Sequence, residues 1–314
     1  MNSLNKDLEL AHTQCSFGSI VDESTKEGYQ YIYPFTNENI NGYLNEFSLN
    51  NKSLLTTGSS GDQVINASIM GVNNATIIDI NPYFKYYYYL KVAALLSLNK
   101  NQYLEFLSYK DYYAYNIHND NVFNKSTFDK IKSTLLALDS DSYIFWNEIF
   151  NTYKPIQIRQ ELFSFDEENV LKLAKINKYL SSTIDYTNAK YYIKNTEVNF
   201  IKGNILNASI EKKYDNIWLS NILEHFKRKE IAECIEKYYS LLNNDGKLLL
   251  SYLYEELIDI DYIKQISPIH RNNYIQELLY NIEFEYKKLK SVYSILDNNT
   301  NKYTDKVLIL KKIK

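Results

Sequence analysis

The stretch that most constrains the fold is SLLTTGSSGDQVINASIMGVNNATIIDINP, from Ser53 to Pro82. It holds an apolar run, a turn with Gly58 and Gly61, a helical pattern and a second apolar run that ends in Asp79. Two apolar runs around a helical pattern are typical of a strand–helix–strand unit. The chain has only 8 glycines, so two in one turn indicate a sharp bend or a close approach by a ligand.

Further apolar runs alternate with helical patterns, which indicates an α/β fold with a doubly wound, mostly parallel sheet. We expect strands at Ser53–Thr57, Ala75–Asp79, Val198–Lys202, Asp215–Ser220 and Lys247–Tyr252. We expect helices at Asp62–Gly71, Pro82–Leu98 and Lys227–Leu242. Gly71 and the sequence NNDG after the last helix are typical helix ends, and Pro82 suits a first turn.

The C-terminal sequences YKKLKSVYSIL and DKVLILKKI, joined by a polar turn, predict a hairpin. The last strand is therefore expected to run antiparallel to the others. A seven-stranded, mostly parallel sheet that ends in such a hairpin is the layout of class I methyltransferase-like proteins, whereas dinucleotide dehydrogenases usually lack it.

The distance from Asp79 to the next predicted strand at Val198 is too long for a plain crossover. Three sequences with helical periodicity lie between them, so we expect residues 99–196 to form a helical insertion. Its expected use is as a lid over the substrate, and structural decoration is the alternative. Residues 51–98 and 197–314 are expected to form a Rossmann-like domain that binds a cofactor.

Residues 1–50 are expected to be an N-terminal extension over the cofactor site. The residues that we expect to contact the cofactor there are Tyr33, Pro34, Phe35 and Thr36. The chain has 31 Tyr, and we interpret YFKYYYYLK as a helix whose tyrosine rings pack while their hydroxyls face water.

The formal net charge of -3 gives no basic surface of the kind that nucleic-acid binding requires, so no nucleic-acid partner is expected. Cys15 and Cys234 are the only cysteines, and no cluster has metal-ligand spacing, so we expect neither disulfides nor a metal. No uncharged apolar stretch approaches the ~18 residues of a transmembrane helix, and no signal peptide is evident. We expect a cytoplasmic protein.

Asp79 follows the glycine turn by the ~20 residues that separate turn and acid in dinucleotide sites. A carboxylate at this strand end accepts hydrogen bonds from both hydroxyls of a ribose. The full G-x-G-x-x-G pattern is absent, and Asp62 beside the turn repels a phosphate but suits an ammonium group. The expected cofactor is therefore S-adenosylmethionine (AdoMet), bound by Gly58, Ser59, Ser60, Gly61, Asp62, Asp79, Ile80 and Asn81.

Two later strand ends supply further candidates. Asn204 follows the third strand, where its amide oxygen can accept from the adenine amino group. Ser220 and Asn221 follow the fourth, with Ser220 expected to bind the cofactor and Asn221 the methionyl group or the acceptor; helix capping is the alternative. His225, one turn further on, is a candidate catalytic residue beside Asn221, and a packed or surface histidine is the alternative.

Three sequences, LTTGSSGDQVINA, IIDINPYFKYYYYLKVAALLSL and YDNIWLSNILEHF, resemble the betaine-lipid-synthase A-like family. Members are AdoMet:diacylglycerol aminocarboxypropyl transferases on the class I methyltransferase fold. The family has a serine–glycine loop, a D-x-N-P turn with an LK-containing helix behind it, and LSN after the fourth strand. The matching segments here are Gly58–Asp62, Asp79–Pro82 and Leu219–Asn221. The resemblance implies AdoMet as the cofactor and a lipid-like acceptor.

These observations predict an AdoMet-dependent transferase that acts on a small-molecule acceptor. Attack on the methyl carbon gives methyl transfer, which is the commoner reaction on this fold. Attack on the methionyl γ-carbon gives aminocarboxypropyl transfer, which the resemblance favours. A non-catalytic AdoMet- or nucleotide-binding protein and a nicotinamide oxidoreductase are the alternatives, and the missing third glycine disfavours the latter.

Overall fold

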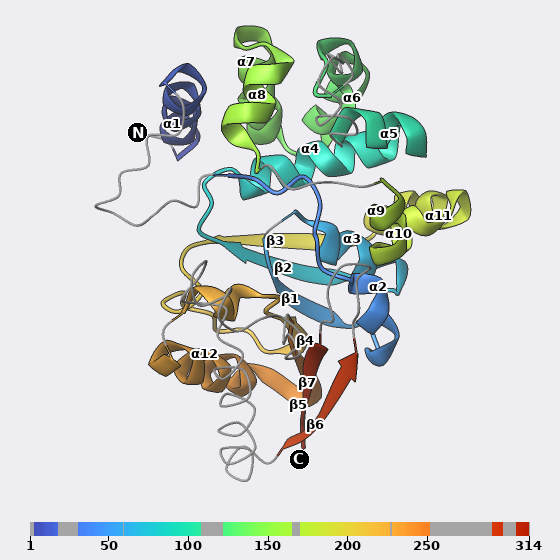
Figure 1. The fold of residues 1–314 in the computed structure, drawn as a ribbon, viewed down its shortest axis with the longest axis vertical. Helices are drawn as coiled ribbons and strands as arrows, with labels where there is room; N and C mark the ends of the chain where they lie inside the picture. Colours follow the sequence, from blue (N-terminus) through green and yellow to red (C-terminus); the bar gives the residue numbers. More distant parts are fainter. Residues whose placement is uncertain are drawn as a thin grey trace, which may run out of the picture. The chain divides into compact units, whose positions relative to one another are not determined.

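The computed structural model describes residues 3–17, 31–58, 60–107, 122–164, 170–226, 228–251, 291–297 and 306–313 (Figure 1). The chain divides into two compact units. We call the first the helical unit; it consists of Met1–Asn37, Gly58–Ile65 and Asp79–Lys194. We call the second the sheet unit; it consists of Glu38–Thr57, Asn66–Ile78 and Asn195–Lys314.

The described strands form one seven-stranded sheet in the order β3-β2-β1-β4-β5-β7-β6. They are β1 (Ser53–Thr57), β2 (Asn74–Asp79), β3 (Glu197–Lys202), β4 (Tyr214–Trp218), β5 (Leu242–Leu250), β6 (Ser291–Asp297) and β7 (Lys306–Lys312). β1 pairs in parallel with β2 and β4, and β4 pairs in parallel with β5. β7 runs antiparallel to both β5 and β6. The predicted fold class, a parallel sheet with a C-terminal antiparallel hairpin, is confirmed.

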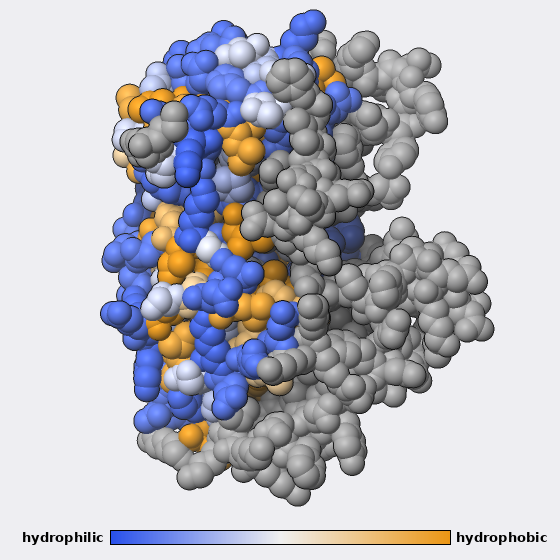
Figure 2. All heavy atoms as spheres, turned by 90° about the vertical axis from the view of Figure 1, so that its left-hand side faces the viewer, coloured by the Kyte–Doolittle hydropathy of each residue, from blue (hydrophilic) through white to orange (hydrophobic). Residues whose placement is uncertain are grey.

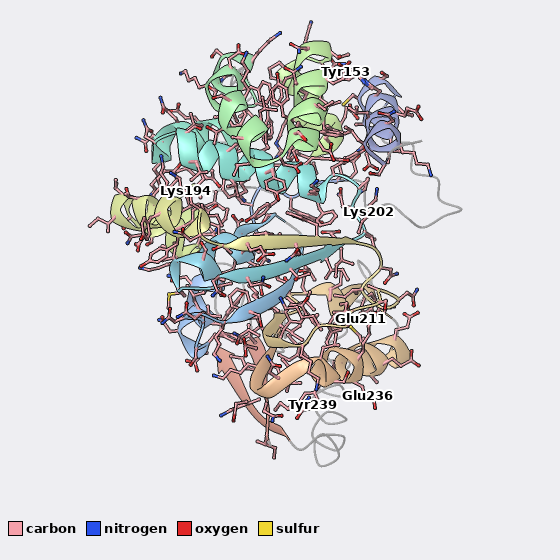
Figure 3. The ribbon with its side chains drawn as sticks, turned by 180° about the vertical axis from the view of Figure 1, so that it is seen from behind. Tyr153, Lys194, Lys202, Glu211, Glu236 and Tyr239 are labelled. Carbon is pink, nitrogen blue, oxygen red and sulfur yellow. The ribbon has the colours of Figure 1, made fainter. Side chains whose placement is uncertain are left out.

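The core of the sheet unit lies on both faces of its central strands. Leu54 and Leu55 of β1 are both fully buried, as expected for a strand between two parallel neighbours. Helix α12 (Arg228–Ser240), which carries the labelled Glu236 and Tyr239 in Figure 3, covers one face. Its buried side chains Ile231, Cys234, Ile235 and Tyr238 form one cluster with Ile217, Leu248 and Leu250 of the sheet.

The opposite face is covered by the segment before β1. Trp218, the neighbour of Ile217 in β4, packs edge-on against Tyr43 and Phe47, with ring centroids 5.4 Å and 5.3 Å away. Tyr43 ends helix α2 (Ile40–Tyr43), and Phe47 follows the short 3-10 helix η1 (Leu44–Glu46). The successive residues of β4 thus hold helices on the two faces of the sheet.

Two predicted boundaries after β4 are wrong. β4 ends at Trp218 rather than Ser220, and Ser220 has φ +53°, outside the extended region in which a regular strand continues. The sequence NNDG does not end α12 but lies inside β5, where the pairing jumps from Tyr214↔Leu242 to Asn216↔Lys247. Asp245 in this irregularity has φ +62°, which Asp tolerates better than most residues.

The helix after the glycine turn, α3 (Asp62–Ile69), ends two residues before the predicted Gly71, and Gly71 closes it as predicted. Gly71 has φ +94°, and its N–H donates to the Ser68 carbonyl at 2.9 Å. The Val72 N–H donates to the Ala67 carbonyl at 3.2 Å. The left-handed backbone of Gly71 thus turns the chain so that two of the last carbonyls of the helix accept hydrogen bonds.

The helical unit is built around aromatic side chains. Its helices are α1 (Ser3–Phe17), α4 (Phe84–Ser97), α5 (Lys100–Leu107), α6 (Lys125–Leu138), α7 (Ser140–Thr152), α8 (Pro155–Leu162), α9 (Val170–Ile176), α10 (Lys178–Ser181) and α11 (Thr183–Ile193). Trp146 of α7 is fully buried and donates to the Tyr86 carbonyl of α4 at 2.8 Å. Tyr153, labelled in Figure 3, lies within hydrogen-bond distance of His12 and Ser16 of α1.

The tyrosine run lies in α4, but three of its tyrosines are buried rather than turned with their hydroxyls toward water as expected. Tyr86, Tyr87 and Tyr88 are all buried. The Tyr86 hydroxyl donates to Asp7 at 3.0 Å, and the Tyr87 hydroxyl donates to the Pro34 carbonyl at 2.6 Å. Complete burial raises the pKa of Tyr88 far above its usual value. These tyrosines therefore supply internal hydrogen bonds as well as packing.

Candidate functional site

Gly58 and Asp79 meet where β1 and β2 end. Thr57 and Ile78 are paired in these parallel strands, and Gly58 and Asp79 are the next residues of each. A Cβ atom added to Gly58 would lie 2.4 Å from Oδ2 and 2.6 Å from Cβ of Asp79. Only glycine therefore allows the carboxylate to lie against the backbone of the first loop.

The D-x-N-P sequence forms a turn that holds Asp79 in place. The Asn81 N–H donates to Asp79 Oδ1 at 2.9 Å. The Asn81 side chain donates to the Tyr31 carbonyl at 2.9 Å and accepts from the Tyr83 N–H at 2.8 Å. Asp79 and Ile80 are half-buried, whereas Asn81 is buried. Asn81 thus fixes the turn that holds Asp79.

The glycine turn itself is narrow. The Gly61 N–H donates to the Gly58 carbonyl at 2.9 Å, and Gly61 has φ +76°. A Cβ atom there would lie 3.0 Å from the ring of Tyr88. Ser60 is fully buried, and Ser59 lies outside the described residues. Both glycines are thus required, one by a left-handed backbone and one by a neighbouring carboxylate.

Asp62 is fully buried. The sequence predicted that its carboxylate would bind the ammonium group of AdoMet, but its partners in the structure are residues of the chain itself. Its Oδ1 lies 2.6 Å from Lys91 Nζ and accepts from the Tyr179 hydroxyl at 2.7 Å. Its Oδ2 accepts from the Thr36 N–H at 2.7 Å and the Ser60 hydroxyl at 2.8 Å. Both oxygens are thus engaged by the protein, and the carboxylate binds the chain's own ammonium group.

Lys91 of α4 is the partner that sequence reasoning missed. It is fully buried, and its Nζ donates to the carbonyls of Pro34 at 2.7 Å and Ser60 at 3.0 Å. The same Nζ lies 4.3 Å from the centroid of the Phe35 ring. With Asp62, these oxygens provide acceptors for all three N–H bonds of the ammonium group. The signal in the sequence is a lysine inside the apolar run YYYYLKVAALL.

Tyr179 extends this cluster into the helices. Its hydroxyl lies 3.1 Å from that of Tyr103, and both side chains are fully buried. Burial, followed by the nearby Asp62 carboxylate, raises the pKa of Tyr179 well above its usual value. The phenol therefore remains protonated and continues to donate to Asp62.

In the sheet unit, Ser220 forms a hydrogen bond with Glu38, an acid that the sequence analysis did not select as a candidate. Its hydroxyl donates to Glu38 Oε2 at 2.9 Å, and the Ser251 hydroxyl donates to Oε1. The Ser251 N–H also donates to the Ser220 carbonyl at 3.1 Å. Glu38 is 1% exposed, so the ends of β4 and β5 share a buried carboxylate. Nothing in the sequence around Glu38 distinguishes it from a surface acid.

The remaining candidates also lie in the sheet unit. Asn204 is exposed, and its side-chain oxygen accepts from the Leu206 N–H at 2.9 Å. Asn221 is half-buried before the 3-10 helix η2 (Ile222–His225), and its side chain does not cap that helix. His225 is the last residue of η2, and its side chain lies outside the described part of the chain.

The described residues contain no group of three or more His, Cys, Asp and Glu side chains that could hold a metal ion. Within the same residues, no helix is both long and apolar enough to cross a membrane. On the face in Figure 2, hydrophilic residues predominate, and hydrophobic residues occur in groups between them. Two of the most exposed large hydrophobic residues, Ile184 and Tyr191, lie on α11.

No protein-family model matches the chain, and no curated protein does. Solved structures do match. The N-methyltransferase NodS from Bradyrhizobium japonicum WM9, in complex with S-adenosyl-L-homocysteine, is 7% identical over 98% of this chain and 99% of that chain, with a TM-score of 0.40. Magnesium protoporphyrin IX methyltransferase (ChlM) from Synechocystis PCC 6803 is 12% identical over 99% and 88%, with a TM-score of 0.37. Strand order and pairing, rather than these distant matches, carry the fold assignment.

Proposed function

We propose that this chain binds AdoMet and transfers its methyl group to a small-molecule acceptor. The contact between Gly58 and Asp79, at the carboxyl ends of neighbouring parallel strands, carries the proposal. Ligands of doubly wound sheets bind outside these strand ends. The Asp79 residue is half-buried, and a carboxylate has two acceptor oxygens, which suit the two adjacent hydroxyls of a ribose.

The remaining contacts are assigned by strand order. Asn204 after β3 is proposed to meet the adenine, and Ser220 and Asn221 after β4 are proposed to face the methionyl group and the acceptor. His225 is retained as the candidate base, and Tyr33, Pro34, Phe35 and Thr36 as the N-terminal contacts to the cofactor. Residues 99–196 are proposed to serve as the lid.

The sulfonium of AdoMet makes its attached carbons electrophilic without a metal. The chain's contribution is then to hold the nucleoside by Asp79, align the acceptor along the C–S bond and exclude water. In methyl transfer the acceptor lone pair forms the new bond to carbon, and the C–S electrons return to sulfur. The acceptor releases a proton, for which a base beside Asn221 is the proposed recipient.

Aminocarboxypropyl transfer is the second candidate. The resemblance to the betaine-lipid-synthase A-like family favours it, and two of the segments that carry this resemblance contain the ion-paired Asp62 and Lys91. In this reaction the γ-carbon of the methionyl group accepts the new bond, and methylthioadenosine leaves.

Mass spectrometry of the nucleoside product separates these candidates. The purified chain is incubated with AdoMet and a small-molecule extract of its own cells. S-adenosylhomocysteine supports methyl transfer, and methylthioadenosine supports aminocarboxypropyl transfer. AdoMet that stays intact although it binds contradicts both and supports a non-catalytic binding protein. Absence of AdoMet binding contradicts the proposed site.

A further inference from the structure

The buried ion pair of Asp62 and Lys91 joins three segments that are far apart in the sequence. Lys91 comes from α4, and Asp62 begins α3 directly after the glycine turn. The third segment is Tyr31–Thr36, whose Pro34 carbonyl accepts from Lys91 and whose Thr36 N–H donates to Asp62. Through these two hydrogen bonds, the ion pair connects the segment Tyr31–Thr36 to the glycine turn.

The other end of this segment is attached to the second loop of the proposed site. The Tyr31 carbonyl accepts from the side chain of Asn81, two residues after Asp79. Tyr31–Thr36 thus runs from the turn that holds Asp79 to the turn that holds Gly58 and Gly61. Tyr33, between the two attachments, is 44% exposed, whereas Phe35 is 2% exposed.

A buried ion pair contributes less to net stability than its distances suggest, because both charges lose their hydration. Removal of one partner is costly, since the other charge then stays buried alone. Each N–H bond of Lys91 has its own acceptor, on three different residues. Such a saturated arrangement fixes one conformation of the segments around it.

The part of the ligand that depends on this conformation follows from the sheet order. Asp79 is the last residue of β2 and is proposed to hold the ribose, and the residues after β4 are proposed to face the acceptor. β1 lies between β2 and β4, so the turn with Gly58 and Gly61 is the part of the proposed site that we expect to meet the amino-acid end of the ligand. We propose that Lys91 is a positioning residue that, through Asp62, sets the backbone binding the amino-acid end of AdoMet; this rests on the proposed function.

The test compares two ligands by calorimetric titration. S-adenosylhomocysteine carries the amino-acid end, and methylthioadenosine lacks it. For Lys91→Met, the affinity for S-adenosylhomocysteine is expected to fall at least about tenfold, while that for methylthioadenosine changes less than about threefold. Lys190→Met is the matched control, because Lys190 also donates to two backbone carbonyls of the same unit, those of Leu96 and Leu98.

Since Lys91→Met leaves a buried carboxylate without its ion-pair partner, the double variant Asp62→Asn/Lys91→Met provides a second test without either charge. It is expected to fold and to show the same selective loss. An unchanged affinity for S-adenosylhomocysteine, or equal losses for both ligands, would overturn the positioning role. If the wild-type chain binds neither ligand, the proposed function itself fails.

Hydrogen exchange on the wild-type chain needs no variant. S-adenosylhomocysteine is expected to slow exchange in a peptide that contains Tyr31–Thr36, where the Thr36 N–H is bonded to Asp62. Methylthioadenosine is expected to have a much smaller effect there. Equal protection by both ligands, or none by S-adenosylhomocysteine, contradicts a link between this segment and the amino-acid end.

Discussion

At the residue scale, Gly58 is the most restricted position of the candidate site, because the Asp79 carboxylate lies where a Cβ atom would be. Gly58→Ala is expected to displace Asp79 and to lower stability by about 1–3 kcal/mol, as overpacking does. AdoMet affinity is expected to fall at least about tenfold. Thermal unfolding and calorimetric titration measure the two effects.

Gly203→Ala is the matched control, since a Cβ atom there meets nothing within 4 Å. Gly203 also lies in a loop after a strand, so the control keeps the local context. An AdoMet affinity that is equal in the wild type and Gly58→Ala contradicts the assignment of Gly58.

The reactivity of the two cysteine thiols tests the packing of the structure at single residues. Cys15 and Cys234 are 3% and 1% exposed, and burial raises the pKa of each to about 12. Both are therefore protonated at pH 8, and the thiolate that reacts with disulfide reagents is scarce. We expect the folded chain to resist labelling by such a reagent and both thiols to react on unfolding. Rapid labelling of the folded chain contradicts their burial.

At the element scale, the end of α3 depends on Gly71. Its φ is +94°, and a Cβ atom there would lie 2.7 Å from the Asn50 side-chain oxygen. Gly71→Ala is expected to destabilise the sheet unit by about 1–3 kcal/mol, because it combines a strained backbone with a close contact. Thermal unfolding measures this, with Gly203→Ala again as the control. A melting temperature within error of the wild type contradicts the role of Gly71.

Asp215 connects the beginnings of three strands. It accepts from the Ser53 N–H and hydroxyl at 3.0 Å and 2.9 Å, and from Asn243 at 3.1 Å. Burial alone raises the pKa of Asp215, but these hydrogen bonds and the Lys52 charge outweigh it and hold the pKa below its usual value. The resulting stabilisation exists above the unfolded pKa of about 3.9 and is lost as pH falls through the folded pKa.

Asp215→Asn is therefore expected to be about 1 kcal/mol less stable than the wild type at pH 7. The difference should shrink as pH is lowered below about 4, because the wild-type carboxylate then becomes protonated too. Urea unfolding at a series of pH values measures this. Asp245→Asn is the control, since Asp245 is an exposed partner of Lys311. A difference that is constant with pH contradicts the prediction.

At the scale of the whole molecule, the elements with strong local signals were predictable. β1 matches its predicted bounds because SLLTT is apolar and β-branched between turn residues. The terminal hairpin and the glycine end of α3 were predictable for the same local reasons. The boundary after β4 was not, since the left-handed Ser220 belongs to a contact with Glu38, which lies 182 residues away in the sequence.

In the candidate site, too, the residues with a local sequence signal were predictable, and those that depend on contacts distant in the sequence were not. Gly58 and Asp79 follow a spacing that can be recognised within one strand–helix–strand unit, and the structure brings them into contact. The partner of Asp62 could not be predicted from that unit, because Lys91 reaches it only when α4 packs beside the turn. Buried charges depend on tertiary contacts that periodicity does not encode.

The central claim is that AdoMet binds at the carboxylate of Asp79, and one calorimetric titration tests it most directly. AdoMet is titrated into the wild-type chain, Asp79→Asn and the control Asp215→Asn. We expect the wild type and the control to bind alike and Asp79→Asn to bind at least about tenfold more weakly, since the amide offers the ribose one acceptor oxygen instead of two. Equal binding by Asp79→Asn, or no binding by the wild type, would contradict the claim.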